Sequence, residues 1–108
     1  MDMAKAAAVA RLNDAARTTL SDCRVVVTRG IAALGKDAEI LHLVQTFSNF
    51  TPSNDPFGEH DFGGFEFADH TIFWKIDCYD IDICMASPDP AEPAVTVRVL
   101  TVMLADEY

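Results

Sequence analysis

The segment 54–64 holds a dense group of ionisable and turn-forming residues, and it reads Asn-Asp-Pro-Phe-Gly-Glu-His-Asp-Phe-Gly-Gly. Carboxylates and imidazoles transfer protons in enzymes and also bind metal ions. The ionisable members are Asp55, Glu59, His60 and Asp61. The Asn-Asp-Pro start favours a turn, and loops held by a rigid scaffold often carry functional side chains. This segment is therefore the first candidate site.

A predicted β-hairpin follows the segment and adds further polar candidates. Strands over 65–68 and 71–79 flank Asp69 and His70, which have the spacing of a two-residue turn. Because side chains alternate along a strand, the apolar residues then share one face and the polar residues share the other. Extending the register places His60, Asp77 and Tyr79 together on the polar face, with Glu66 and Lys75 as a diagonal ion pair.

This grouping supports a catalytic hypothesis. His60 would carry a proton while Asp77 orients it, or His60, Asp61 and Asp77 would bind a metal ion. The chain has no nucleophile-elbow motif and no metal motif such as His-Glu-x-x-His or Cys-x-x-Cys. We therefore expect neither a cofactor nor a bound metal.

Two other interpretations of the segment are open. In a scaffold, Asn54 and Asp55 would accept backbone hydrogen bonds in a turn, and the glycines would permit unusual dihedral angles. In a binding surface, Asn54, Asp55 and Glu59 would contact a partner. Turn chemistry favours the scaffold over both binding and catalysis.

The elements that must position these residues have clear patterns. Residues 4–20 predict an amphipathic helix with Val9, Leu12, Ala16 and Leu20 inside and Arg11, Asn13, Asp14 and Arg17 outside. A β-branched run at 24–28 predicts a buried strand, and 31–34 a helical turn. A second helix begins near Asp37 and presents Ile40, Val44, Phe47 and Phe50 on one face.

The C-terminal third of the chain is harder to interpret. A further strand is expected at 83–86, followed by a rigid, proline-rich linker at 87–93. Residues 95–104 fit both a strand and a helical face, and Pro93 at the entry favours the helix. We expect a single α+β domain over residues 1–108, in which helices pack on one face of a small antiparallel sheet of three to four strands.

Composition limits the function. Seventeen acidic residues against eight basic ones give a formal net charge of −9, which disfavours direct binding to nucleic acid. Such acidity suits a protein partner with a basic surface, a cation or, as the default, simple solubility. An ordered row of acids could also mimic nucleic acid. No apolar run is long enough to cross a membrane, and the alanine-rich start lacks the pattern of a signal peptide, so we expect none. Three cysteines without paired spacing indicate reduced thiols, so we expect a cytoplasmic protein.

The chain also resembles a known family. Asn54-Asp55-Pro56, His60-Asp61-Phe62-Gly63, Trp74-Lys75-Ile76-Asp77, Asp89-Pro90 and Arg98-Val99-Leu100-Thr101 are together similar to small bacterial proteins classed as a domain of unknown function. Cys78 departs from the pattern, which has an aromatic residue there. The resemblance implies a group often carried on plasmids and integrated elements, and hence a non-catalytic accessory or regulatory interaction protein. The alternatives are a small hydrolase that uses His60, Asp61 and Asp77, and an acidic mimic of nucleic acid.

Overall fold

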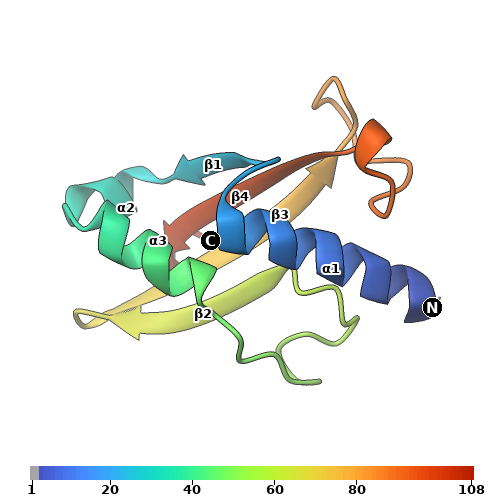
Figure 1. Cartoon of the computed structure of the whole chain (residues 1–108). Coiled ribbons are helices and arrows are strands. Elements are labelled where there is room, and N and C mark those ends of the chain that lie inside the picture. The colour runs from blue at the N-terminus through green and yellow to red at the C-terminus, as the bar shows by residue number, and fades with distance from the viewer. Residues whose placement is uncertain (1–2) are drawn as a thin grey trace.

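The computed structural model describes residues 3–108, which form a layer of helices packed on a four-stranded sheet (Figure 1). The helices are α1 (Met3–Thr19), α2 (Arg29–Ala33) and α3 (Asp37–Gln45). The strands are β1 (Arg24–Val27), β2 (Phe62–Phe67), β3 (His70–Tyr79) and β4 (Val97–Leu104). Short 3-10 turns, η1 (Pro93–Val95) and η2 (Ala105–Glu107), flank β4. The predicted α+β class is confirmed.

The sheet is mixed rather than purely antiparallel, with strand order β1-β4-β3-β2. β3 pairs antiparallel with both β2 and β4, whereas β1 runs parallel to β4. The helix expected near the C-terminus is therefore wrong, because that segment is the central strand β4. Its alternation explains this: Leu100 and Val102 are fully buried under the helices, while Val99 and Thr101 lie on the opposite face. Pro93 starts only η1.

Two other strand predictions need correction. β1 forms as expected but is an outer strand, so Val25 and Val26 are 39% and 46% exposed rather than buried. The strand expected at 83–86 does not form, and the segment makes a single bridge between Tyr79 and Ala86. The backbone amide of Cys84 donates a hydrogen bond to the carboxylate of Asp80 and closes this segment into a tight loop. Too few residues then remain extended to pair as a strand.

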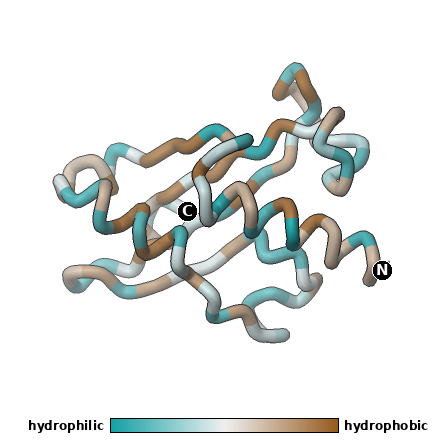
Figure 2. The backbone as a smooth tube through the Cα atoms, viewed as in Figure 1, coloured by the Kyte–Doolittle hydropathy of each residue, from teal (hydrophilic) through white to brown (hydrophobic). Residues whose placement is uncertain are grey.

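The hydrophobic core lies between the helices and one face of the sheet. Its buried members are Ile31, Ile40, Val44, Ile72, Trp74, Ile76, Leu100 and Val102. Figure 1 shows α1 crossing this face at one end while α2 and α3 cover the other. Hydropathy alternates along the elements, and the loop between α3 and β2 is mostly white or teal (Figure 2). Among residues 3–108, no helix has the length and hydropathy that crossing a bilayer requires.

The β2–β3 hairpin forms with a register two residues from the predicted one. Its turn is Ala68–Asp69, both at positive φ, so Phe65 faces Ile72 and Gly63 faces Trp74. The indole ring of Trp74 explains this register, because it requires a glycine opposite: a Cβ at Gly63 would come within 2.5 Å of Trp74 Nε1. A shift of two residues preserves the faces. Trp74 is accordingly fully buried, and Lys75 lies on the opposite face as predicted.

The face of the sheet that the helices leave uncovered carries paired polar groups and an aromatic cluster. Lys75 Nζ lies 2.7 Å from Asp77 Oδ2, and this contact raises the pKa of Lys75. Glu66 instead accepts a hydrogen bond from Thr71, so the predicted Glu66–Lys75 pair does not form. Phe62, Phe73 and Tyr108 contact one another at centroid distances between 5.1 and 5.8 Å.

Candidate functional site

The site begins with three polar residues of α1 that face the protein rather than solvent. Asn13 and Arg17 are 1% and 3% exposed, and Asp14 lies beside them with an intermediate exposure. The prediction that these residues form the outer face of the helix is therefore wrong. The buried stripe of α1 consists of Ala6, Val9, Ala10, Asn13, Ala16 and Arg17. Its small residues bring the helix close to the sheet, and polar groups continue the stripe.

Arg17 binds the end of α3. Its Nη1 donates hydrogen bonds to the carbonyl oxygens of Val44 (2.9 Å), Gln45 (3.2 Å) and Phe47 (2.8 Å). The last carbonyls of a helix lack partners within the helix, so Arg17 supplies what α3 needs there. The guanidinium also lies 5.0 Å from the centroid of Trp74, and its Nη2 pairs with Asp14 at 2.9 Å.

His60 lies between two carboxylates. Its Nδ1 is 2.9 Å from Asp14 Oδ2, and its Nε2 is 3.5 Å from Asp55 Oδ2. The ring stacks on Phe50 with centroids 3.9 Å apart and planes 1° apart. Its backbone adopts φ +54°, which few residues other than glycine tolerate. The surrounding contacts thus hold His60 in one position, with both ring nitrogens facing a partner.

Asn54 and Asp55 shape the loop that carries His60. Asn54 Oδ1 accepts from the Thr51 amide at 2.8 Å, and its Nδ2 donates to the Asn49 carbonyl at 2.8 Å. The side chain of Asp55 is only 6% exposed, and it accepts the backbone amide of His60 at 3.3 Å. These bonds are turn and loop contacts of the kind that the scaffold interpretation requires.

The loop concentrates negative charge. Desolvation, together with the charges of Asp61 and Asp55, raises the pKa of Glu59. Desolvation also raises the pKa of Asp61, with further contributions from Asp55 and Asp77, although a backbone hydrogen bond and His60 oppose the shift. Repulsion among these carboxylates therefore favours a cationic neighbour.

The structure does not assemble the proposed trio of His60, Asp77 and Tyr79. Phe62 pairs with Lys75, so the ladder ends before His60, and the ring of His60 contacts Phe50, Asp14 and Asp55 instead. Asp77 pairs with Lys75 on the uncovered face of the sheet. The charge of Asp77 contributes to the raised pKa of Asp61. The ion pairs of His60, however, are with Asp14 and Asp55. Within residues 3–108, no group of three or more His, Cys, Asp or Glu side chains is arranged to hold a metal ion.

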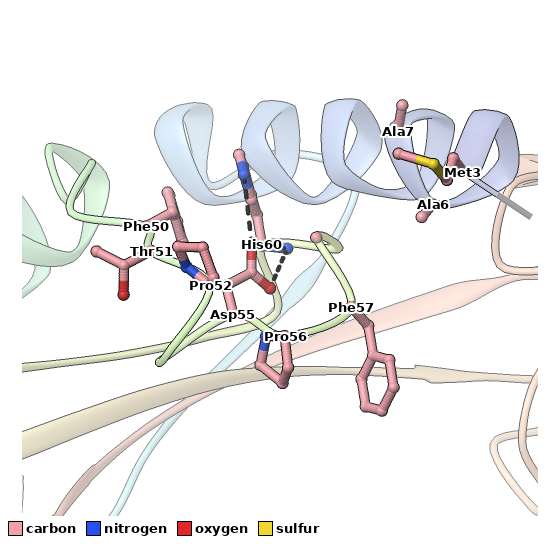
Figure 3. A pocket seen from close by; sticks show the side chains of 11 residues that line it. Met3, Ala6, Ala7, Phe50, Thr51, Pro52, Asp55, Pro56, Phe57 and His60 are labelled. Carbon is pink, nitrogen blue, oxygen red and sulfur yellow. Dashed lines mark hydrogen bonds and ion pairs between the residues drawn. The ribbon is translucent and has the colours of Figure 1, made fainter. Parts of the chain in front are cut away.

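A groove opens beside His60, with a volume of about 600 Å³. In Figure 3, Met3, Ala6 and Ala7 of α1 lie along one side, and dashed lines join His60 to Asp55. Phe57 extends away from the other labelled side chains and is 62% exposed. The remaining lining residues are Phe50, Thr51, Pro52, Pro56 and Gly58. The groove is therefore mostly apolar, and a buried carboxylate and a partly exposed imidazole contribute to its lining.

Sequence reasoning missed Asp14, Arg17 and Phe50 as members of the site. The signal that could have found Arg17 was the stripe at positions 6, 10, 13 and 17, whose spacing places polar residues in line with buried alanines. Asp14 has no such signal, because only the fold brings it to a histidine 46 positions away.

A scan against protein-family models matched residues 27–107, more than half of the chain, to the family described as "Protein of unknown function (DUF3768)". The chain belongs to this family. No curated protein and no solved structure gave a significant match. The resemblance to a domain of unknown function is thus confirmed.

The DUF3768 match divides the site. Asp55 and His60 lie within the matched residues, whereas Asp14 and Arg17 on α1 lie before them. The DUF3768 segment therefore supplies the loop and most of the sheet. The preceding helix supplies the carboxylate that pairs with His60 and the guanidinium that binds α3.

Proposed function

We propose that this protein is a non-catalytic accessory or regulatory interaction protein of a bacterial plasmid or integrated element, and that it works in the cytoplasm. Its groove binds a segment of a partner protein that combines basic and apolar side chains. The sequence resemblance supports the genetic context. The observation that carries the interaction role is an apolar groove lined by a fixed histidine, whose loop also carries the crowded carboxylates Glu59 and Asp61.

The contacts of His60 argue for structure rather than proton transfer. A general base needs a ring nitrogen within reach of the substrate. Here Nδ1 faces Asp14, Nε2 faces Asp55, and Phe50 covers one face of the ring. Burial raises the pKa of the Cys78 thiol, which disfavours the reactive thiolate form. These features support a scaffold that holds the groove open.

The surroundings of the groove favour a basic, partly apolar segment. Met3 and Phe57 are large apolar side chains, 82% and 62% exposed, and such side chains gain free energy when a partner covers them. Glu59 and Asp61 do not line the groove, but they flank His60 in the same loop and repel each other. A Lys or Arg side chain of the partner would relieve this repulsion and add charge-assisted contacts.

Photo-crosslinking inside bacterial cells tests this proposal. A benzophenone amino acid replaces Phe57, and a matched variant carries it at Ile81, which is 63% exposed at another part of the surface. We expect a discrete product from position 57 that is absent from position 81. Mass spectrometry should locate the link in a Lys- or Arg-bearing segment. Glu59→Gln should lower the yield several-fold.

Each alternative result would contradict the proposal in a different way. Equal products from both positions would show that exposure alone drives the reaction. A linked segment rich in Asp and Glu would contradict the charge argument. Absence of any product at position 57, when the protein is expressed and folded, would remove the groove as an interaction surface.

A further inference from the structure

Two arginines are buried among residues 3–108, and only one of them has a counter-ion. Arg17 pairs with Asp14. Arg98, which is 5% exposed, has no carboxylate within ion-pair distance in this part of the chain. Its Nε donates to Asn13 Oδ1 at 2.7 Å, and its Nη2 donates to the carbonyl oxygen of Pro90. Both acceptors are neutral, so the positive charge of Arg98 is buried without compensation.

The third nitrogen of this guanidinium, Nη1, has no acceptor within residues 3–108. The fully enclosed side-chain nitrogens without a partner there are Arg17 Nε and Trp74 Nε1, so Arg98 Nη1 is not sealed inside the protein. Arg98 lines a hollow of about 630 Å³ between the C-terminal half of α1 and the start of β4. Burying an unpaired charge is costly, and buried charges are normally paired. A ligand anion in this hollow would supply the missing partner.

The lining of the hollow restricts the anion. Apolar surface comes from Leu12, Ala15, Ala16 and Pro93, and hydroxyl groups come from Thr19, Ser21 and Thr96. Asp22 also lines the hollow, and the carbonyl end of α1 adds a negative partial charge. One arginine nitrogen opposed by these negative groups suits a monoanion, and it disfavours a phosphate dianion.

We propose that the hollow between α1 and η1 binds a small organic monocarboxylate. The carboxylate accepts from Arg98 Nη1, and the apolar body of the ligand packs on Leu12, Ala15 and Pro93. The hollow shares no lining residue with the His60 groove. This second site is therefore independent of the proposed partner-binding function.

Nuclear magnetic resonance on the whole ¹⁵N-labelled chain tests the proposal, with hexanoate as the probe. Hexanamide has a similar shape without the charge, and inorganic phosphate tests the anion class. We expect hexanoate to shift the Arg98 Nε–H resonance in a saturable manner, with hexanamide and phosphate binding at least about tenfold more weakly.

A variant that fills the hollow keeps the test independent of folding. Ala15 is an exposed residue of α1 that lines the hollow, so Ala15→Leu occupies the space without removing a bond of Arg98. Ala4→Leu is the matched control, because it lies on the same helix away from the hollow. Ala15→Leu should weaken hexanoate binding by about tenfold or more, and Ala4→Leu should leave it unchanged. An absent shift, equal binding of hexanamide, tighter binding of phosphate, or full binding by Ala15→Leu would each overturn the assignment.

Discussion

His60 Nδ1 lies 2.9 Å from Asp14 Oδ2, and this contact joins the loop before β2 to the first helix. The same carboxylate also pairs with Arg17, which in turn binds the last carbonyls of α3. Asp14 therefore links α1 to the His60 loop directly, and to the end of α3 through Arg17. Asn13 adds a second link between α1 and the loop, because its Nδ2 donates to the carbonyl oxygen of Glu59 at 2.9 Å.

The first prediction concerns the coupling between Asp14 and His60. Asp14→Ala should lower the free energy of unfolding by about 1–3 kcal/mol, because it removes contacts with two groups that can carry positive charge. The same change should cost less in a His60→Ala background, since one contact is already absent. Urea denaturation of the four proteins in this cycle measures the difference. Additive effects would show that the 2.9 Å contact contributes no stability.

Arg17 provides the second prediction. Arg17→Lys should destabilise the protein by at least about 2 kcal/mol, because one ammonium cannot bond three carbonyls and Asp14 while packing on Trp74. Arg11→Lys is the control on the exposed side of the same helix, and it should change stability by less than about 0.5 kcal/mol. Equal effects of the two substitutions would contradict the assigned role of Arg17.

The third prediction separates scaffold from surface within the loop. Asp55→Ala should cost about 0.5–2 kcal/mol, because the nearly buried carboxylate accepts the His60 amide. Glu59→Gln should not lower the thermal midpoint, since none of the described hydrogen bonds holds its side chain and desolvation already raises the pKa of its carboxyl. If Asp55→Ala keeps full stability yet loses crosslinking through position 57, the loop is the functional site and not its support.

Much of the fold was predictable from periodicity. The helix over 4–20 and the hairpin follow from patterns of 3.6 and 2 residues, because each element must bury one apolar face. The C-terminal strand was not, since residues 95–104 fit both periods. Its parallel pairing with β1 depends on contacts across more than seventy positions, which local patterns do not encode.

The site was predictable only in part. Turn chemistry correctly indicated that Asn54 and Asp55 shape the loop. The partners of His60 were not accessible, because they depend on where α1 crosses the sheet. A polar residue in a helix is normally assigned to the solvent side, and the burial of Arg17 depends on the three carbonyls and Asp14 that bind its two Nη nitrogens.

The last prediction concerns Asp61 and pH. The pKa of its carboxyl in the folded protein is raised above the ordinary value of 3.8, mainly by desolvation, so the folded state binds the proton more tightly than the unfolded state. Stability therefore falls as pH rises through the interval between the two pKa values, and Asp61 remains destabilising above it.

Asp61→Asn removes this titration while keeping a side-chain oxygen. The variant should be more stable than the natural chain at about pH 7, and its advantage should shrink as the pH falls toward about 4. Urea denaturation across this range checks both trends. Subtracting the free energy of unfolding of the natural chain from that of the variant removes the contributions of the other titrating groups. Asp82→Asn is a suitable control, because Asp82 is exposed on the loop after β3. An advantage that stays constant with pH would show that Asp61→Asn acts through packing and not through the carboxylate charge.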